Sequence, residues 1–164
     1  MKKIFYLMIL AAIVLAACQP KTQPVDTAAA KIEVNALMDK HLIAWNAKDA
    51  ITLTALLADD GLFCGTAPTE LMDKKTISDA WIQVFADTAF NNPFTLDKRE
   101  IRLVSDGNFA IVMEQFIKNP YTPKISWRHV SHVVKTSDGW KFDFISWSLI
   151  PKNEDIGKLN KALE

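Results

Sequence analysis

The sequence predicts an α+β domain in which helices pack on one side of a curved, mostly antiparallel sheet. Apolar residues recur at helical spacing in the first half of the chain, whereas strand-like runs dominate the second half. Asp106-Gly107 and Asp138-Gly139 each stand between two such runs and indicate tight hairpins. An order of helix, helix, strand, helix and four antiparallel strands is typical of two packed layers.

The first two helices are expected from the spacing of apolar residues. The first helix begins at Asp26 or Thr27, either of which can cap it, and its apolar positions continue to Trp45. Residues 46–49, Asn-Ala-Lys-Asp, break this helix. The second helix is short and ends at residues 59–61, Asp-Asp-Gly, where glycine suits a left-handed cap.

A strand and a third helix are expected next. Residues 62–64, Leu-Phe-Cys, form the strand, and a turn follows at Pro68. Asp73 can cap the third helix, which carries Ile77 and Trp81 along one apolar face. That face needs a sheet to cover it.

Four strands complete the predicted domain. They span residues 94–104, 108–117, 125–135 and 140–149. Because a short Asp-Gly turn joins each pair, the two members of a pair are expected to be antiparallel neighbours.

The second hairpin also predicts a register. Pairing Lys135 with Trp140 places His132 opposite Asp143, which we interpret as a structural pair on the face away from the helices. The same face would pair Val130 with Ile145 and Arg128 with Trp147. The face toward the helices would hold Trp127, His129, Ser131 and Val133 against Phe142, Phe144, Ser146 and Ser148.

The N-terminus is typical of an exported protein. Two lysines precede an uncharged apolar run at residues 4–14, which is shorter than the roughly 20 residues that span a bilayer. Residues 15–18, Leu-Ala-Ala-Cys, resemble the bacterial lipobox. This resemblance implies that residues 1–17 are a signal peptide and that Cys18 receives diacylglycerol and a further acyl chain, such as palmitate.

Lipid on Cys18 predicts a protein held at the membrane of the cell envelope. Residues 18–29 would form the lipidated cysteine and a spacer, residues 30–151 the folded domain, and residues 152–164 a tail that can form a helix. Gln19 after the cysteine resembles an outer-membrane sorting signal. In a cell with two membranes we therefore expect the outer membrane, with the domain facing the periplasm.

Charge and cysteine content argue against a nucleic-acid partner and against an intramolecular disulfide. The chain has 19 basic and 19 acidic residues and no basic block, so a nucleic acid is not an expected partner. Cys18 and Cys64 are the two cysteines. Since Cys18 would carry lipid, no intramolecular disulfide is expected.

Two stretches of the sequence resemble a known family. Residues 41–64, from His-Leu-Ile-Ala-Trp-Asn to Leu-Phe-Cys, look like the opening of the SnoaL-like branch of the nuclear transport factor 2-like superfamily. Residues 127–134, 138–142 and 147–148 look like its closing strands. The resemblance implies a cone-shaped fold with a pocket between helices and sheet, but it implies no single function, so function depends on the site.

The resemblance also marks three positions that matter in ketosteroid isomerases of the superfamily. The position of the carboxylate base falls at Gly65, between Cys64 and Thr66, so that role is empty. The helix-one tyrosine falls at His41, and the late-strand acid falls at or near Ser131. Isomerase chemistry of that kind is therefore not expected.

Inward-facing rings predict a pocket for a small, mainly apolar molecule. Aromatic walls with a few polar side chains hold such a ligand by few hydrogen bonds. The expected lining is Trp45, Phe63, Trp81, Phe85, Phe116, Trp127, His129, Ser131 and Phe144. No metal or other cofactor is expected, because 3 histidines without close spacing form no metal motif.

Two other functions stay open. His41 or His129, with Ser131, can serve as acid or base in an enzyme of isomerase, dehydratase or hydrolase type. Alternatively, the resemblance implies a homodimer through the convex sheet face, to which residues 153–164 would add a short amphipathic helix.

Overall fold

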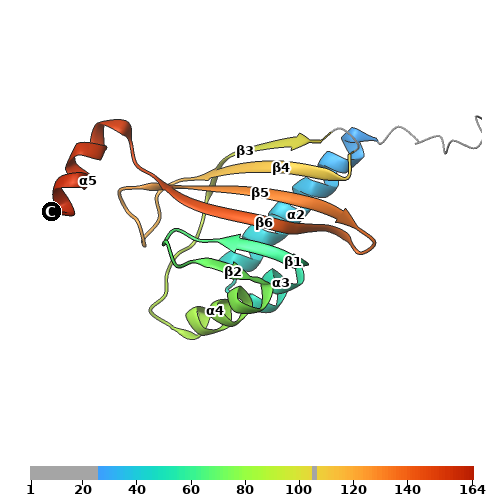
Figure 1. Ribbon diagram of the computed structural model, residues 1–164, viewed down its shortest axis with the longest axis horizontal. Coiled ribbons are helices and arrows are strands. Elements are labelled where there is room, and N and C mark those ends of the chain that lie inside the picture. The colour runs from blue at the N-terminus through green and yellow to red at the C-terminus, as the bar shows by residue number, and fades with distance from the viewer. Residues whose placement is uncertain (1–25, 105–106) are drawn as a thin grey trace, which may run out of the picture.

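The computed structural model describes residues 26–104 and 107–164. The predicted signal peptide, Cys18, Gln19 and the spacer up to residue 25 lie outside the described residues, as does Asp106 of the first hairpin turn. The elements are α2 Thr27–Asn46, α3 Ala50–Ala55, β1 Leu57–Cys64, β2 Leu71–Asp73, α4 Lys74–Ala86, β3 Leu96–Leu103, β4 Phe109–Phe116, β5 Ser126–Thr136, β6 Gly139–Ile150, the 3-10 turn η1 Asn153–Asp155 and α5 Ile156–Ala162 (Figure 1).

The strands form one curved, mixed sheet of six strands in the order β2-β1-β6-β5-β4-β3. All neighbours are antiparallel except β1 and β6, which are parallel. Helix α2 lies across one face of the sheet, and α3 and α4 lie beside β1 and β2 (Figure 1). The predicted α+β class is confirmed, and β2 is a strand that the sequence analysis did not foresee.

Side-chain caps fix the helix starts at two predicted residues. Asp26 accepts hydrogen bonds from the backbone N–H groups of the first turn of α2, and Asp73 accepts one from Thr76 at the start of α4. Residues 27–29, assigned to the spacer from sequence, are therefore helical. The break after Asn46 is confirmed, and Lys48 adopts a φ of 56° there.

The predicted end of the second helix is wrong. Helix α3 ends at Ala55, and residues 59–61 belong to β1. The backbone of this segment leaves the helix early because it pairs with β6, where the N–H of Phe142 donates to Leu56 O at 2.9 Å. Gly61 serves this close approach rather than a left-handed cap, since a Cβ there would lie 3.1 Å from Phe142 O.

Both predicted hairpins are present, but the register of the second differs from the prediction from His132 onward. Lys135 pairs with Trp140 and Val134 with Lys141 as expected. Asp143 of β6 is an extra residue opposite His132 and Val133 of β5, and this β-bulge shifts the pairing, so that Arg128 faces Ser148 and His129 faces Trp147. The expected pairs of Arg128 with Trp147, Val130 with Ile145 and His132 with Asp143 are therefore wrong as backbone partners.

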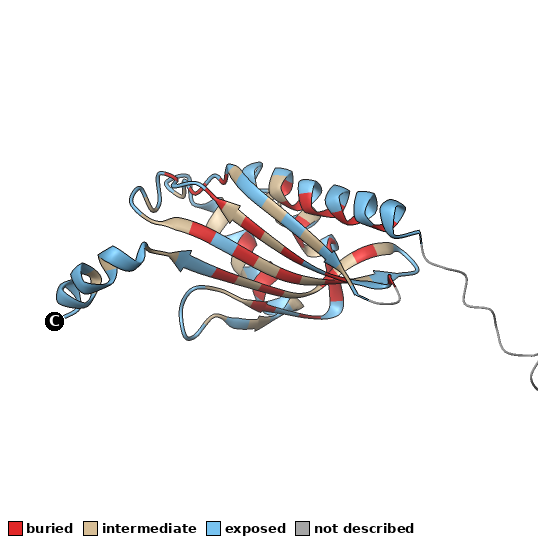
Figure 2. Cartoon of the chain, turned by 90° about the horizontal axis from the view of Figure 1, so that it is seen from above, coloured by how far each residue is buried: buried red, intermediate tan, exposed pale blue. Residues whose placement is uncertain are grey.

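The bulge reverses the two faces of the later part of β6. Ile145 and Trp147 turn inward and are buried, whereas Phe144, Ser146 and Ser148 are not buried. Figure 2 shows the buried residues gathered where α2 meets the sheet. The core thus lies between the helices and the concave sheet face.

The C-terminal residues extend away from the rest of the domain (Figure 1). Helix α5 follows the 3-10 turn η1, and neither contains a buried residue. Among the described residues, no helix is both long and apolar enough to cross a membrane.

Candidate ligand-binding cavity

A cavity of about 300 Å³ opens near the C-terminal end of α2. It lies among the end of α2, β1, β2, α4, the segment before β3 and the ends of β5 and β6. Its lining is Trp45, Phe63, Gly65, Thr66, Glu70, Met72, Ile77, Ala80, Trp81, Val84, Phe90, Asn92, Phe94, Tyr121, Trp127 and Trp147.

Half of the lining residues are aromatic, and their rings pack against one another. Phe94 stacks on Trp147 with ring centroids 4.7 Å apart, and Trp45 lies 6.0 Å from Trp147. On the other side, Phe63 meets Trp81 edge to face at 5.7 Å. Packed ring pairs of this kind each contribute about 0.5–1.5 kcal/mol beyond area burial, so the wall is largely preformed.

The end of α2 positions the segment that carries Phe90 and Phe94. The side chain of Asn46 donates to Phe94 O at 2.9 Å and accepts from Phe94 N at 2.8 Å. The indole N–H of Trp45 donates to Asn92 O at 2.8 Å. The helix break that the sequence predicted at Asn46 therefore also anchors one wall of the cavity.

The four tryptophans of the lining differ in whether their indole N–H groups are hydrogen-bonded. Trp127 Nε1 donates to Thr122 Oγ1 at 2.5 Å, and Trp45 is bonded as described above. The indole N–H groups of Trp81 and Trp147 have no acceptor within the described part of the chain. An acceptor on a bound molecule would satisfy them.

Glu70 supplies a carboxylate that the sequence analysis missed. Its Oε2 accepts the N–H of Ala67 at 2.9 Å, and its backbone carbonyl accepts the N–H of Gly65 at 2.8 Å. The side chain lies over Gly65 so closely that a Cβ at residue 65 would collide with the carboxylate. Gly65, the position that corresponds to the isomerase base, is thus covered by the carboxylate of Glu70. Only the return of the chain from β1 to β2 brings this acid there.

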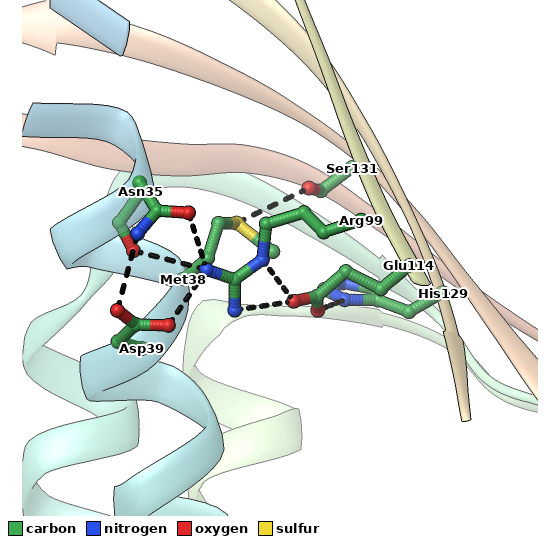
Figure 3. Close-up of polar contacts among 7 residues, drawn as sticks. All are labelled: Asn35, Met38, Asp39, Arg99, Glu114, His129 and Ser131. Carbon is green, nitrogen blue, oxygen red and sulfur yellow. Dashed lines mark hydrogen bonds and ion pairs between the residues drawn. The ribbon is translucent and has the colours of Figure 1, made fainter. Parts of the chain in front are cut away.

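A buried network of charged side chains lies between α2 and the sheet. Glu114 Oε2 lies 3.0 Å from His129 Nδ1, and Glu114 Oε1 accepts from Arg99 Nε at 2.7 Å. Arg99 reaches across to α2, where its Nη1 donates to Asp39 at 2.6 Å and to Asn35 Oδ1 at 2.7 Å (Figure 3). Glu114 and His129 are fully buried.

Neither buried histidine lines the cavity. His129 stacks on Trp147 at 4.6 Å with an interplanar angle of 9°, and His41 stacks on His129 at 5.2 Å. Burial, with smaller contributions from His129 and Arg99, holds the pKa of His41 well below its usual value. In the described part of the chain, Nε2 of both histidines lacks a hydrogen-bond partner.

The cavity gathers four residues of the expected lining, namely Trp45, Phe63, Trp81 and Trp127. The others lie elsewhere. Phe85 packs against Trp45, and Phe116 stacks on Trp147. Ser131 Oγ lies 4.0 Å from Met38 Sδ, in the buried layer below α2 (Figure 3).

Phe144 and Trp147 exchange roles because of the bulge in the second hairpin. Phe144 is on the convex face, opposite His132, whereas Trp147 enters the cavity wall. The sequence analysis also missed Phe90, Phe94 and Tyr121. All three lie in segments between helices and strands, where no periodic pattern assigns a side chain to a face.

The remaining polar candidates lie outside the cavity. His132 Nδ1 lies 2.7 Å from Asp143 Oδ2 on the convex face, and Cys64 is a half-buried free thiol. Asp59 forms an exposed ion pair with Lys74 at 2.9 Å. Among the described residues, no three His, Cys, Asp or Glu side chains gather in a way that could hold a metal ion.

The sequence of residues 34–151 matches the model of the SnoaL-like domain family. The chain belongs to this family. The match covers α2 from Val34 through the end of β6, so the cavity and the buried network both lie in the SnoaL-like domain. No curated protein matches the chain in sequence.

Solved structures share the fold of the SnoaL-like domain. A domain of unknown function with a cystatin-like fold from Nostoc punctiforme is 17% identical, with a TM-score of 0.67 over 81% of this chain and 85% of that one. A putative aromatic ring hydroxylase from Novosphingobium aromaticivorans is 15% identical, with a TM-score of 0.63 over 76% and 92%. An NTF2-like protein from Cytophaga hutchinsonii is 21% identical, with a TM-score of 0.59 over 71% and 95%.

Proposed function

We propose that this SnoaL-like domain binds a small, mainly apolar molecule that contains a ring. The observation that carries the proposal is the aromatic cavity of about 300 Å³. A cavity of that size with rigid ring walls and few polar groups suits a flat apolar ligand. The free N–H groups of Trp81 and Trp147 would orient an acceptor on it.

Native mass spectrometry of the protein purified from cells tests this proposal. We expect an additional bound mass that disappears after mild organic extraction. Ala80→Phe, which fills the cavity from α4, should abolish the bound mass. Ile82→Phe on the exposed side of the same helix is the matched control and should retain it. A bare wild-type protein that also binds no added aromatic compound would contradict the proposal.

Catalysis by a pocket histidine receives less support than binding. His41 and His129 are buried beside Trp147 rather than in the cavity lining, and Ser131 lies below α2. A general base must come within hydrogen-bond reach of its substrate. A histidine enzyme would therefore need Trp147 to move.

A second candidate function is self-association through the convex sheet face. Leu62 of β1 and Phe109 and Ile111 of β4 are 41%, 38% and 46% exposed on this face. We expect a dimer in light scattering of the purified protein and a monomer for Ile111→Lys. The control Ile32→Lys changes an exposed isoleucine of α2 and should leave the dimer intact. A monomeric wild type would refute the candidate.

We further propose that lipid on Cys18 anchors the domain in the cell envelope, at the outer membrane facing the periplasm where two membranes exist. The lipobox-like residues 15–18 and the short apolar run before them support this. The ligand would then be met in the envelope rather than in the cytoplasm.

A further inference from the structure

Glu70 is the one charged side chain among the residues that line the cavity. The lining contains no lysine, arginine or histidine. Glu70 also has no ion-pair partner in the described part of the chain. The aromatic wall therefore carries an uncompensated negative charge.

The carboxylate of Glu70 is held in place rather than free at the surface. The N–H of Ala67 fixes Oε2 at 2.9 Å, and the absence of a side chain at Gly65 leaves the space that the carboxylate occupies. Oε1 accepts no hydrogen bond from the described residues. A half-buried carboxylate with one free oxygen and a fixed position is prepared for a positive partner.

The aromatic rings of the lining also favour a positively charged ligand. The faces of tryptophan, tyrosine and phenylalanine attract a cation by about 0.5–1 kcal/mol when exposed and about 2 kcal/mol when water is excluded. The lining residue Phe90 already makes such a contact: the ammonium of Lys48 lies 5.7 Å from its ring centroid. That ammonium is bound to Phe90 O at 2.5 Å, and Lys48 does not line the cavity.

We propose that the ligand of this cavity is a small organic cation, an alkylated or protonated amine on an apolar body, with Glu70 as its counter-ion. This inference rests on the proposed binding function and adds the charge of the ligand. The ammonium would lie near Glu70 while the apolar body contacts the rings, and an anion of the same shape would be repelled.

A pair of ligands that differ in charge alone provides the test. Benzyltrimethylammonium and its neutral carbon analogue, neopentylbenzene, have the same shape. Binding to the purified full-length chain can be followed by tryptophan fluorescence, since Trp45, Trp81, Trp127 and Trp147 line the cavity. We expect the cation to bind about tenfold more tightly than the neutral analogue.

Glu70→Gln should reduce this preference by about threefold or more, and the part that remains is the attraction of the ring faces for a cation. The glutamine oxygen can still accept the N–H of Ala67, so the turn is kept. Glu100→Gln is the matched control, because it makes the same charge change at an exposed site on β3. Its preference should equal that of the wild type.

The outcomes separate the two proposals. If the neutral analogue binds the wild type as tightly as the cation, the charge inference fails while the binding function stands. An unchanged preference in Glu70→Gln also overturns the inference. If neither compound binds and nothing co-purifies, both proposals fail. The wild-type comparison decides the inference even if Glu70→Gln does not fold.

Discussion

At the scale of single residues, Glu114 is the centre of the buried network of charged side chains. It accepts from Arg99 and contacts His129, and His129 in turn stacks on the cavity residue Trp147. A carboxylate taken out of water is tolerated only when its partners are complete. The network therefore connects the stability of the core to the position of one cavity wall.

Glu114→Gln should destabilise the domain by about 3 kcal/mol, because it leaves the guanidinium of Arg99 without its buried counter-charge. Urea unfolding measures this loss. Glu100→Gln, which removes only an exposed ion pair with Lys98, should cost less than about 1 kcal/mol. Equal losses in the two variants would show that the buried network contributes nothing special.

His41 should make stability fall in mild acid. Burial holds its folded-state pKa well below the usual histidine value of 6.5. Below about pH 6.5 the unfolded chain binds a proton at His41 that the folded protein does not. The free energy of unfolding contributed by His41 is thus fully present above that pH and decreases by about 1.4 kcal/mol per unit as the pH falls toward the folded-state pKa.

Urea unfolding of the wild type and of His41→Phe between pH 7 and pH 5 checks this expectation. The difference between the two slopes isolates His41, since the other titrating groups are common to both proteins. Parallel curves would contradict it.

At the scale of elements, a helix cap and a bulge position the cavity. Asp73 starts α4, which contributes Ala80, Trp81 and Val84 to the wall. The bulge in the β5–β6 hairpin turns Trp147 toward the same space. The cap and the bulge each act on a few residues, and each thereby sets the position of part of the cavity wall.

Asp73→Ala should cost about 1 kcal/mol, because the N–H of Thr76 loses its acceptor at the start of α4. Asp79→Ala in the middle of the same helix removes only the exposed ion pair with Lys75 and should cost about 0.3–0.5 kcal/mol. Thermal unfolding distinguishes the two. Similar shifts would mean that the cap is not what stabilises this helix.

At the scale of the whole molecule, helix α2 separates Asp26, where the described residues begin, from the cavity. Its 20 residues extend about 30 Å, and the cavity residue Trp45 lies at its far end. A domain tethered through residues before Asp26 would thus hold its cavity at the end of α2 distant from the tether.

Replacing Cys18 by serine should move the protein from the membrane fraction to the soluble fraction, because no lipid can then be attached. Fractionation with mass analysis of the N-terminal peptide measures this. Cys64→Ser is the control for loss of a thiol within the domain and should leave the protein in the membrane fraction. A soluble wild type would contradict lipid anchoring.

The sequence by itself determined the α+β class, a first helix capped at Asp26 or Thr27, the cap at Asp73, the break at Asn46 and both hairpins. These features depend on neighbours close in the chain, where periodicity, capping and turn chemistry act. Rings with a clear place in a helix or strand, such as Trp81 and Trp127, could also be assigned to the cavity.

Only the tertiary structure decided which later residues of β6 point inward. A one-residue shift reverses every later side chain of a strand, and the sequence carries no local signal for the bulge that causes it here. The carboxylate at the cavity was likewise decided by the tertiary structure. Glu70 comes to lie over Gly65 because β2 folds back on β1, a contact between segments that no sequence spacing specifies.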